Sequence, residues 1–494
     1  MKILPITNQL NNQPTLNRVQ NKYSSNINQR NELPKGIDSK FFSNISFKGE
    51  KEFLEASKNG DLDAVIRELN NGVNINAKNE YKHTALMLAA EGGHVKITEH
   101  LLNNAKIDVN LKDDNGWTAL MYASTYGRDK ITEQLLNNEK IDVNLQDNNE
   151  QTALMKASYK GHDKVTEQLL NNAKIDVNLK DDNGRTALMK ASYKGHDKVT
   201  KQILKNAKID VNLQDNNGRT ALMDASRRGH DKVTKQILKN EKIDVNLQDN
   251  NGRTALMYAS DQGYDKITEQ LLKNKNIDIN TQDRYGETAL MDAIYKGHDR
   301  ITEQLLNNEK IDVNLQDNDG KTALIHALER NNEKVTEQLL KNKNIDINIQ
   351  DMYGETALMF ASYKGHDKIT EQLLNNEKID VNLQDNNGRT ALMISSEIGN
   401  YKIVEQLLNN ENIDVNLKDK DGKTALIHAL ESNNEKVIEL LLQRKDIDFD
   451  VENDKEENVP FYTTAGITAI LTASKAFNNP NFKNKLMKLM RMLK

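Results

Sequence analysis

The chain has 494 residues, of which 37% are hydrophobic, 5% aromatic and 29% charged, and its formal net charge is −5. The low apolar content disfavours one large core, and so small a charge excludes a general attraction to nucleic acid or anionic lipid. The sequence contains no cysteine, which excludes disulfides, thiolate metal sites and cysteine nucleophiles and fits a reducing compartment.

Residues 1–48 are rich in Asn, Gln and Ser and show little periodicity, so we predict a disordered Asn/Gln-rich leader. No apolar run at its start reaches the ~7 residues of a secretory signal, and none in the chain approaches the ~18 residues of a membrane span. We expect a soluble, cytoplasmic protein without a transmembrane segment. Delivery into a host cell stays open.

A repeat organises most of the chain. The tripeptide Thr-Ala-Leu begins at Thr84 and recurs every 34 residues up to Thr424, in eleven copies without an insertion. Such regular spacing means that each unit makes the same contacts with the next. Residues 53–70 carry two helical patterns without the tripeptide, as expected of an N-terminal cap. We therefore predict a repeat array over residues 49–445.

One unit, residues 186–219, shows the expected local structure. Thr186 is a good N-cap for a short helix that Gly195 ends, and Asp197 can cap a second helix. The apolar stripe of that second helix is Val199, Ile203 and Leu204. The stretch from residue 209 to 213 alternates like a strand, and residues 215–218 form a tight-turn signal.

Two repeats depart from this unit where the glycine between the helices is replaced by Asn331 and Asn433. Asparagine adopts the left-handed conformation less readily than glycine does. We expect local fraying in these two repeats.

The C-terminal part breaks the spacing. Residues 446–464 form an acidic insertion whose carboxylates match five positions of a calcium-binding loop, but Val451 stands where that loop needs glycine. We predict a solvated acidic hairpin there. Residues 465–494 restore the pattern as a C-terminal capping repeat, which brings the expected number of helix pairs to thirteen. The last helix, after Pro480, is basic and amphipathic, which also suits a membrane surface or a partner groove.

A period of 34 residues also occurs in tetratricopeptide repeats, but their tryptophan–leucine–glycine–tyrosine pattern is absent. The unit has Thr-Ala-Leu-Met-x-Ala, then Gly-His, Leu-Leu, Ile-Asp-Val-Asn and a turn that contains Asp and Gly. This pattern resembles the ankyrin repeat, with Ala in place of Pro and Met or Ile in place of His. The resemblance implies an α-dominated repeat solenoid: ankyrin helix–turn–helix pairs with β-hairpin-like loops, stacked in a curved array. We expect a monomer.

Five histidines share the position after the glycine, and adjacent copies should lie ~10 Å apart, too far to share one metal ion. They are His162, His196, His230, His298 and His366. The resemblance implies that each bonds within its own loop, so we predict no metal site. No nucleophile and base recur together and no phosphate-binding loop is present, so we predict no catalytic residue, no cofactor and no enzymatic activity.

The resemblance also implies that a partner binds the hairpin tips and the concave side of the first helices. The register places three residues of each repeat on that side: the residue after Met, and the two before Gly. They vary while the rest of the repeat is constant, which is typical of a tuned surface but also of neutral drift. The candidates are Tyr122, Tyr126, Lys156, Tyr159, Lys160, Lys190, Tyr193, Lys194, Arg227, Arg228, Tyr258, Phe360 and Tyr363.

Six of these candidates form a basic stripe with tyrosines among them: Lys156, Lys160, Lys190, Lys194, Arg227 and Arg228. Aromatic and Arg side chains are common anchors of protein interfaces, and a basic stripe favours an acidic segment. We therefore predict a non-enzymatic scaffold that binds a protein partner. The alternatives are an ordinary solvated face, a binder of nucleic acid or an anionic surface, and an effector-like bacterial ankyrin protein that acts on host proteins.

Overall fold

The computed structural model describes residues 39–448. Helix α2 (Ser39–Asn59) begins inside the predicted leader, earlier than the boundary proposed at residue 48. The rest of that leader, most of the acidic insertion, the C-terminal capping repeat and its last helix lie outside the described residues. Of the insertion, Asp446 is described, and its carboxylate accepts hydrogen bonds from Arg444 at 2.9 and 2.7 Å.

The described residues form 24 helices in consecutive pairs, and the thirteenth predicted pair lies outside them. The chain divides into two compact units, residues 1–243 (unit 1) and 244–494 (unit 2). Unit 1 contains α2, α3 (Leu62–Asn70), α4 (Ala85–Gly92), α5 (Val95–Leu102), α6 (Ala119–Thr125), α7 (Asp129–Leu136), α8 (Ala153–Lys160), α9 (Asp163–Leu170), α10 (Ala187–Lys194), α11 (Asp197–Leu204), α12 (Ala221–Arg228) and α13 (Asp231–Ile237).

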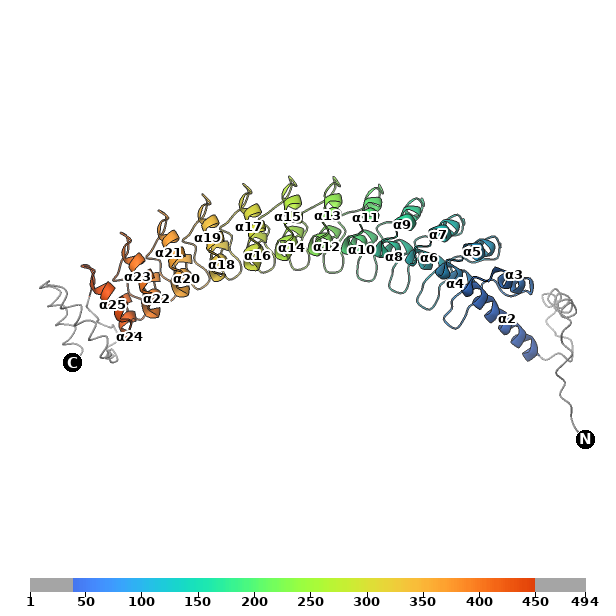
Figure 1. Cartoon of the computed structure of the whole chain (residues 1–494), viewed down its shortest axis with the longest axis horizontal. Helices are drawn as coiled ribbons and strands as arrows, with labels where there is room; N and C mark the ends of the chain where they lie inside the picture. The colour runs from blue at the N-terminus through green and yellow to red at the C-terminus, as the bar shows by residue number, and fades with distance from the viewer. Residues whose placement is uncertain (1–38, 449–494) are drawn as a thin grey trace, which may run out of the picture. The chain divides into compact units, whose positions relative to one another are not determined.

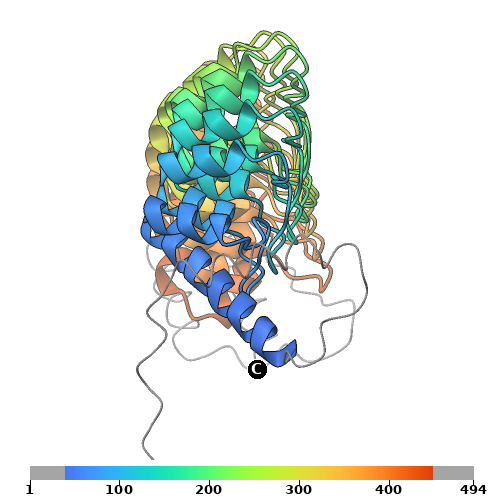
Figure 2. The same ribbon diagram turned by 90° about the vertical axis from the view of Figure 1, so that its right-hand side faces the viewer.

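Unit 2 contains α14 (Ala255–Gln262), α15 (Asp265–Leu272), α16 (Ala289–Lys296), α17 (Asp299–Leu306), α18 (Ala323–Glu329), α19 (Glu333–Leu340), α20 (Ala357–Lys364), α21 (Asp367–Leu374), α22 (Ala391–Ile398), α23 (Tyr401–Leu408), α24 (Ala425–Glu431) and α25 (Glu435–Leu442). Within each unit the first helices of successive pairs lie side by side in one row and the second helices in another (Figure 1). The loops that join successive pairs project on one side of these rows (Figure 2). The predicted curvature of the whole array stays a prediction.

The helix ends follow the predicted local chemistry with one exception. The Thr186 hydroxyl accepts the N–H of Met189 at 3.3 Å, and Gly195 ends α10 in the left-handed conformation at φ 75°. The N-cap of α11 is His196, so Asp197 is the first helical residue and the cap predicted there is wrong. An acidic residue in the first helical turn still stabilises the helix through its dipole.

Asn331 and Asn433 are left-handed as predicted, with φ of 53° and 55°. The apolar stripe of the second helix is correct for Val199 and Ile203, which are buried, whereas Leu204 is half-buried at the rim. The core of each repeat therefore lies between the two rows of helices and is completed by the next repeat. No helix within residues 39–448 is long and apolar enough to cross a membrane.

The loops form hairpin-like turns without strands, so the strand predicted at residues 209–213 is wrong. Over the described range there are only two isolated bridges, Lys78 with Thr84 and Gln316 with Thr322. The alternation is real, since Val211 is 2% exposed between polar neighbours. The backbone there bonds to side chains in place of a neighbouring strand.

An asparagine in each loop makes these bonds. The Asn178 side chain accepts the N–H of Asp210 at 2.9 Å and donates to the carbonyl of Lys208 at 2.8 Å, both in the next repeat. The hairpins are also joined directly, as where Asn216 N–H donates to the Asn183 carbonyl at 3.0 Å. Polar side chains thus hold neighbouring repeats together, which explains how a chain with so little apolar content folds.

Candidate binding face

Each hairpin turn after the first begins with an aspartate, buried in most repeats, which we call the turn aspartate. In the turn before α8 it is Asp147, whose Oδ1 accepts the N–H groups of Asn149 at 3.0 Å and Gln151 at 2.8 Å. Its Oδ2 accepts a hydrogen bond from Lys156 Nζ at 2.7 Å, and Lys156 is only 7% exposed. One carboxylate therefore both shapes the hairpin and binds the following helix.

Lys156 occupies the position directly after Met or Ile in the first helix, which we call the pairing position. The residue there donates to the turn aspartate in other repeats as well. The pairs are Tyr122 to Asp113 at 2.7 Å, Lys190 to Asp181 at 2.6 Å, Tyr258 to Asp249 at 2.5 Å, His326 to Asp317 at 2.8 Å and His428 to Asp419 at 2.8 Å.

These pairs correct the basic stripe. Lys156 and Lys190 are buried side chains that each neutralise a carboxylate, Tyr122 is buried and donates a hydrogen bond to one, and Tyr258 is half-buried. Burial lowers the pKa of Lys156, and the hydrogen bond with Asp147 opposes that effect. A signal for this role was present in the sequence, because an aspartate stands nine residues before each of these donors.

Five repeats lack this pair and show what it provides. At Asp224 the pairing position is itself acidic, and burial raises its pKa to about 6, while Arg219 takes over the turn aspartate at 3.0 Å. Asp292 is likewise buried, which raises its pKa, and it accepts a hydrogen bond from Arg253 at 2.7 Å.

The other three repeats carry an apolar residue at the pairing position. In one of them Ile394 follows Asp385, whose Oδ2 accepts a hydrogen bond from Arg389 at 3.0 Å. Leu88 follows a turn with Asn79, a neutral residue that needs no counter-charge. Phe360 follows Asp351, whose buried Oδ2 has no hydrogen-bond partner among the described residues. A carboxylate in the turn therefore goes with a donor in nearly every described repeat.

The exposed candidates of unit 1 lie at the ends of the first helices. Lys194 Nζ lies 4.5 Å from the ring centre of Tyr159, and the Arg228 guanidinium lies 4.3 Å from that of Tyr193 and donates to its hydroxyl. The hydrogen bond with Lys194 lowers the pKa of the Tyr159 hydroxyl. Each contact joins the residue before the glycine in one repeat to a tyrosine of the preceding repeat. These exposed side chains are therefore ordered by contacts between repeats.

The other candidates of unit 1 differ in how exposed they are and in whether they already bond to a neighbouring carboxylate. The Tyr126 hydroxyl donates to Glu91 at 3.2 Å, and its side chain is 46% exposed. Lys160 is exposed, whereas Arg227 is half-buried with its guanidinium 3.9 Å from the carboxylate of Asp224. The basic part of the exposed row therefore consists of Lys160, Lys194 and Arg228.

Unit 2 presents a more apolar region. Tyr363 is 63% exposed at the end of α20, while Phe360 is half-buried. Sequence reasoning missed the hairpin tip of the same repeat, where Met352 and Tyr353 are 54% and 59% exposed. A signal for them was that these two residues replace the Asn or Asp found at most other tips.

The recurring histidines bond to the preceding repeat, so the bond predicted within their own loop is wrong. His196 Nε2 lies 3.0 Å from the carbonyl oxygen of Tyr159, and His230 Nε2 lies 3.1 Å from that of Tyr193. These two histidines therefore hold the backbone of Tyr159 and Tyr193 in place, whereas His162, His298 and His366 bond to the carbonyls of Thr125, Asp261 and Leu328. The described residues contain no group of three or more metal-ligating side chains.

Comparison with known proteins agrees with this architecture. A model of the family described as "Ankyrin repeats (3 copies)" matches residues 53–147, 132–215, 202–283, 275–351 and 358–453. A search among curated proteins found no match. Repeats of this family are general protein–protein interaction modules and generally lack enzymatic activity. The fold and this match confirm what the sequence pattern indicated: the chain belongs to the ankyrin-repeat family.

Proposed function

We propose that the chain is a scaffold that binds a protein partner through the exposed ends of the first helices in unit 1. This surface, the first-helix face, consists of Tyr126, Tyr159, Lys160, Tyr193, Lys194 and Arg228. The observation that carries the proposal is the contact that two tyrosines of this face make with a cation of the next repeat, Tyr159 with Lys194 and Tyr193 with Arg228.

The energetics favour binding by such a row. Tyr and Arg side chains supply much of the affinity of protein interfaces, and here their rings and guanidinium groups are already ordered. Ordered side chains lose little conformational entropy when a partner binds. Lys160, Lys194 and Arg228 are exposed and do not bond to a turn aspartate as Lys156 and Lys190 do, so an acidic segment of the partner suits them.

The same observations weigh against nucleic acid. Two of the six cations of the predicted stripe, Lys156 and Lys190, are neutralised by buried aspartates, and Arg227 lies near Asp224. Fewer cations are left to bind phosphates than the sequence suggested. The proposal that the chain acts on host proteins concerns the source of the partner and leaves the site unchanged.

A binding experiment tests the first-helix face. The variant carries Tyr159→Thr, Tyr193→Thr, Lys194→Gln and Arg228→Gln, which are residue types that the array already has at equivalent positions in Thr125 and Gln262. The control carries four exposed, charge-balanced substitutions on α7 and α9: Lys130→Gln, Glu133→Gln, Lys164→Gln and Glu167→Gln.

Full-length chain, variant and control are used to capture proteins from a cell lysate. We expect one or more proteins that bind the wild-type chain and the control but are lost from the variant. Identical capture by all three would contradict the assignment of the site to this face and direct attention to Phe360, Tyr363 and the hairpin tip at residues 352–353.

A further inference from the structure

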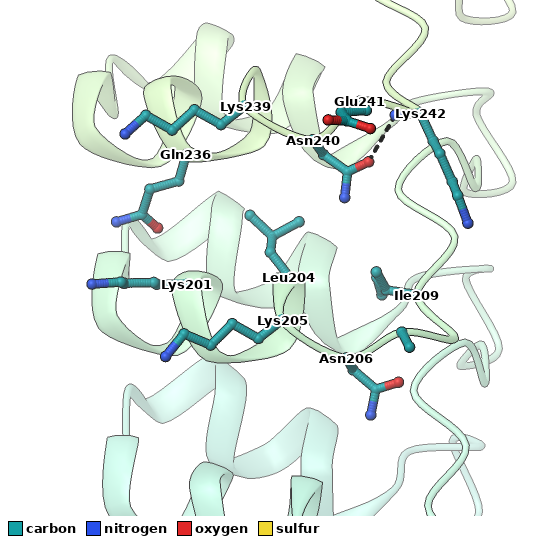
Figure 3. Close-up of a pocket in the computed structure, with 11 residues that line it drawn as sticks. Lys201, Leu204, Lys205, Asn206, Ile209, Gln236, Lys239, Asn240, Glu241 and Lys242 are labelled. Carbon is teal, nitrogen blue, oxygen red and sulfur yellow. Dashed lines mark hydrogen bonds between the residues drawn. The ribbon is translucent and has the colours of Figure 1, made fainter.

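The second helices of unit 1 carry a hollow that the first-helix face does not use. It lies between α11 and α13 and has a volume of about 570 Å³. Leu204 points into its middle, Lys201, Lys205 and Lys239 extend along one side, and Lys242 lies at the other (Figure 3). One acidic residue, Glu241, lines the hollow.

The charge around this hollow is unusual for the array. Helix α11 and the turn after it carry lysines at residues 198, 201, 205 and 208, and α13 repeats all four after 34 residues. The helices α9 and α15 carry Glu167 and Glu269 where α11 and α13 carry Lys201 and Lys235. The lysine face is defined as the eight lysines at residues 198, 201, 205, 208, 232, 235, 239 and 242.

Lys198 pairs with Asp163 at 3.6 Å, but stability does not explain the lysines at residues 201 and 205. In α15 and α19, lysines at the position of Lys205 are paired, Lys273 with Glu269 at 2.5 Å and Lys341 with Glu337 at 2.7 Å. In α11 the position of that glutamate is occupied by Lys201. Lys201 and Lys205 are therefore two like charges four residues apart, which destabilises the helix. Within residues 39–448 neither Lys201 nor Lys205 has an ion pair.

The lining also has an apolar part. Leu204 is half-buried and Ile209 is buried beneath the lysines, and the exposed methyl group of Ala207 lies beside them. No aromatic ring lines the hollow, so it offers no platform on which nucleic-acid bases could stack. Cations around a small apolar floor match carboxylates that flank an apolar side chain.

We propose that the lysine face binds an acidic peptide segment of a protein partner, with one apolar side chain of that segment against Leu204 and Ile209. The inference does not rest on the first-helix face, which lies on the other row of helices. A partner that contacts either face, or both, is compatible with a scaffold.

The test uses full-length protein and a short fluorescent peptide of glutamates around one central leucine. The variant carries Lys201→Glu, Lys205→Asn, Lys235→Glu and Lys239→Asn, which gives both helices the residues of α9, Glu167 and Asn171. Because the array already contains these residues in the same positions, we expect the variant to fold. The control carries Lys273→Asn and Lys341→Asn in unit 2.

We expect the variant to bind the peptide at least about tenfold more weakly, since each exposed ion pair contributes a factor of roughly 1.5 to 5. The control should bind like the wild type, and replacing the central leucine by serine should weaken binding. Equal affinity of variant and wild type would overturn the proposal. The proposal would also be overturned if the leucine-to-serine change in the peptide did not weaken binding and polyuridine RNA bound as tightly as the peptide. That result would indicate non-specific binding of anions. Lysate capture through the first-helix face should be unchanged in this variant, so the two proposals fail separately.

Discussion

Replacing Lys156 by leucine removes the donor from a buried carboxylate and tests the role of the pairing position. In the wild type, Lys156 and Asp147 are 7% and 5% exposed and joined at 2.7 Å. The first repeat provides the matched alternative, because Leu88 occurs there with Asn79 in the turn. Asn79 Oδ1 accepts the N–H groups of Tyr81 at 3.0 Å and His83 at 2.8 Å, as the turn aspartate does elsewhere.

Removing one partner of a buried ion pair typically costs about 3 to 5 kcal/mol, because the remaining charge is left without compensation. We therefore expect Lys156→Leu to lower the local free energy of unfolding by about 3 kcal/mol. The double variant Asp147→Asn with Lys156→Leu reproduces the chemistry of Asn79 and Leu88 and should recover most of the loss. The non-additivity of the two changes measures their coupling.

Hydrogen exchange of the full-length chain, followed by mass spectrometry, measures this locally. We expect amides of residues 118–190 to exchange about a hundredfold faster in Lys156→Leu, which corresponds to the ~3 kcal/mol loss. Exposed Lys160→Leu serves as the control and should leave exchange unchanged. Wild-type protection in Lys156→Leu, or no recovery in the double variant, would refute the reasoning.

Three further predictions concern stability. Phe360→Tyr should place a hydroxyl beside the unpartnered oxygen of Asp351 and raise the free energy of unfolding by about 1 to 2 kcal/mol in denaturant titrations; no gain would show that this oxygen is already satisfied. Because burial raises the pKa of Asp224 to about 6 from 3.8, the folded state loses stability as pH rises between these values. Asp224→Asn should therefore be more stable at pH 7 by up to about 3 kcal/mol, with the gain vanishing near pH 4; a pH-independent difference would contradict this. Asn331→Gly and Asn433→Gly should slow amide exchange in their repeats by relieving left-handed backbone strain; equal exchange rates before and after would remove the predicted fraying.

Much of the fold could be predicted from sequence because each rule acts locally. Thr186 and Gly195 bound a helix by their own hydrogen-bonding and backbone preferences, and the exact 34-residue spacing carries that result along the array. The prediction of a strand at residues 209–213 was wrong, because alternating apolar and polar residues indicate that one side of the chain is buried but do not indicate which groups accept and donate its backbone hydrogen bonds. Here Asn178 of the preceding repeat takes them.

The candidate site was predicted less well, for a physical reason. Helical register places Lys156 and Tyr159 on neighbouring parts of one helix, but it cannot show that the preceding hairpin folds back over Lys156 alone. Likewise, His196 bonds to a carbonyl 37 residues away, a contact between repeats that one repeat read alone does not contain. Contacts between repeats therefore decide which variable residues are structural and which are exposed.

Site-specific photocrosslinking tests the central claim, that a protein partner contacts the first-helix face, most directly. A photoreactive phenylalanine analogue replaces Tyr159 in the full-length chain, and the same analogue replaces exposed Glu167 on α9 as the reference. After irradiation in lysate, we predict a discrete crosslinked protein from the Tyr159 position and none from the Glu167 position. No adduct at Tyr159, or the same adduct from both positions, would contradict the account.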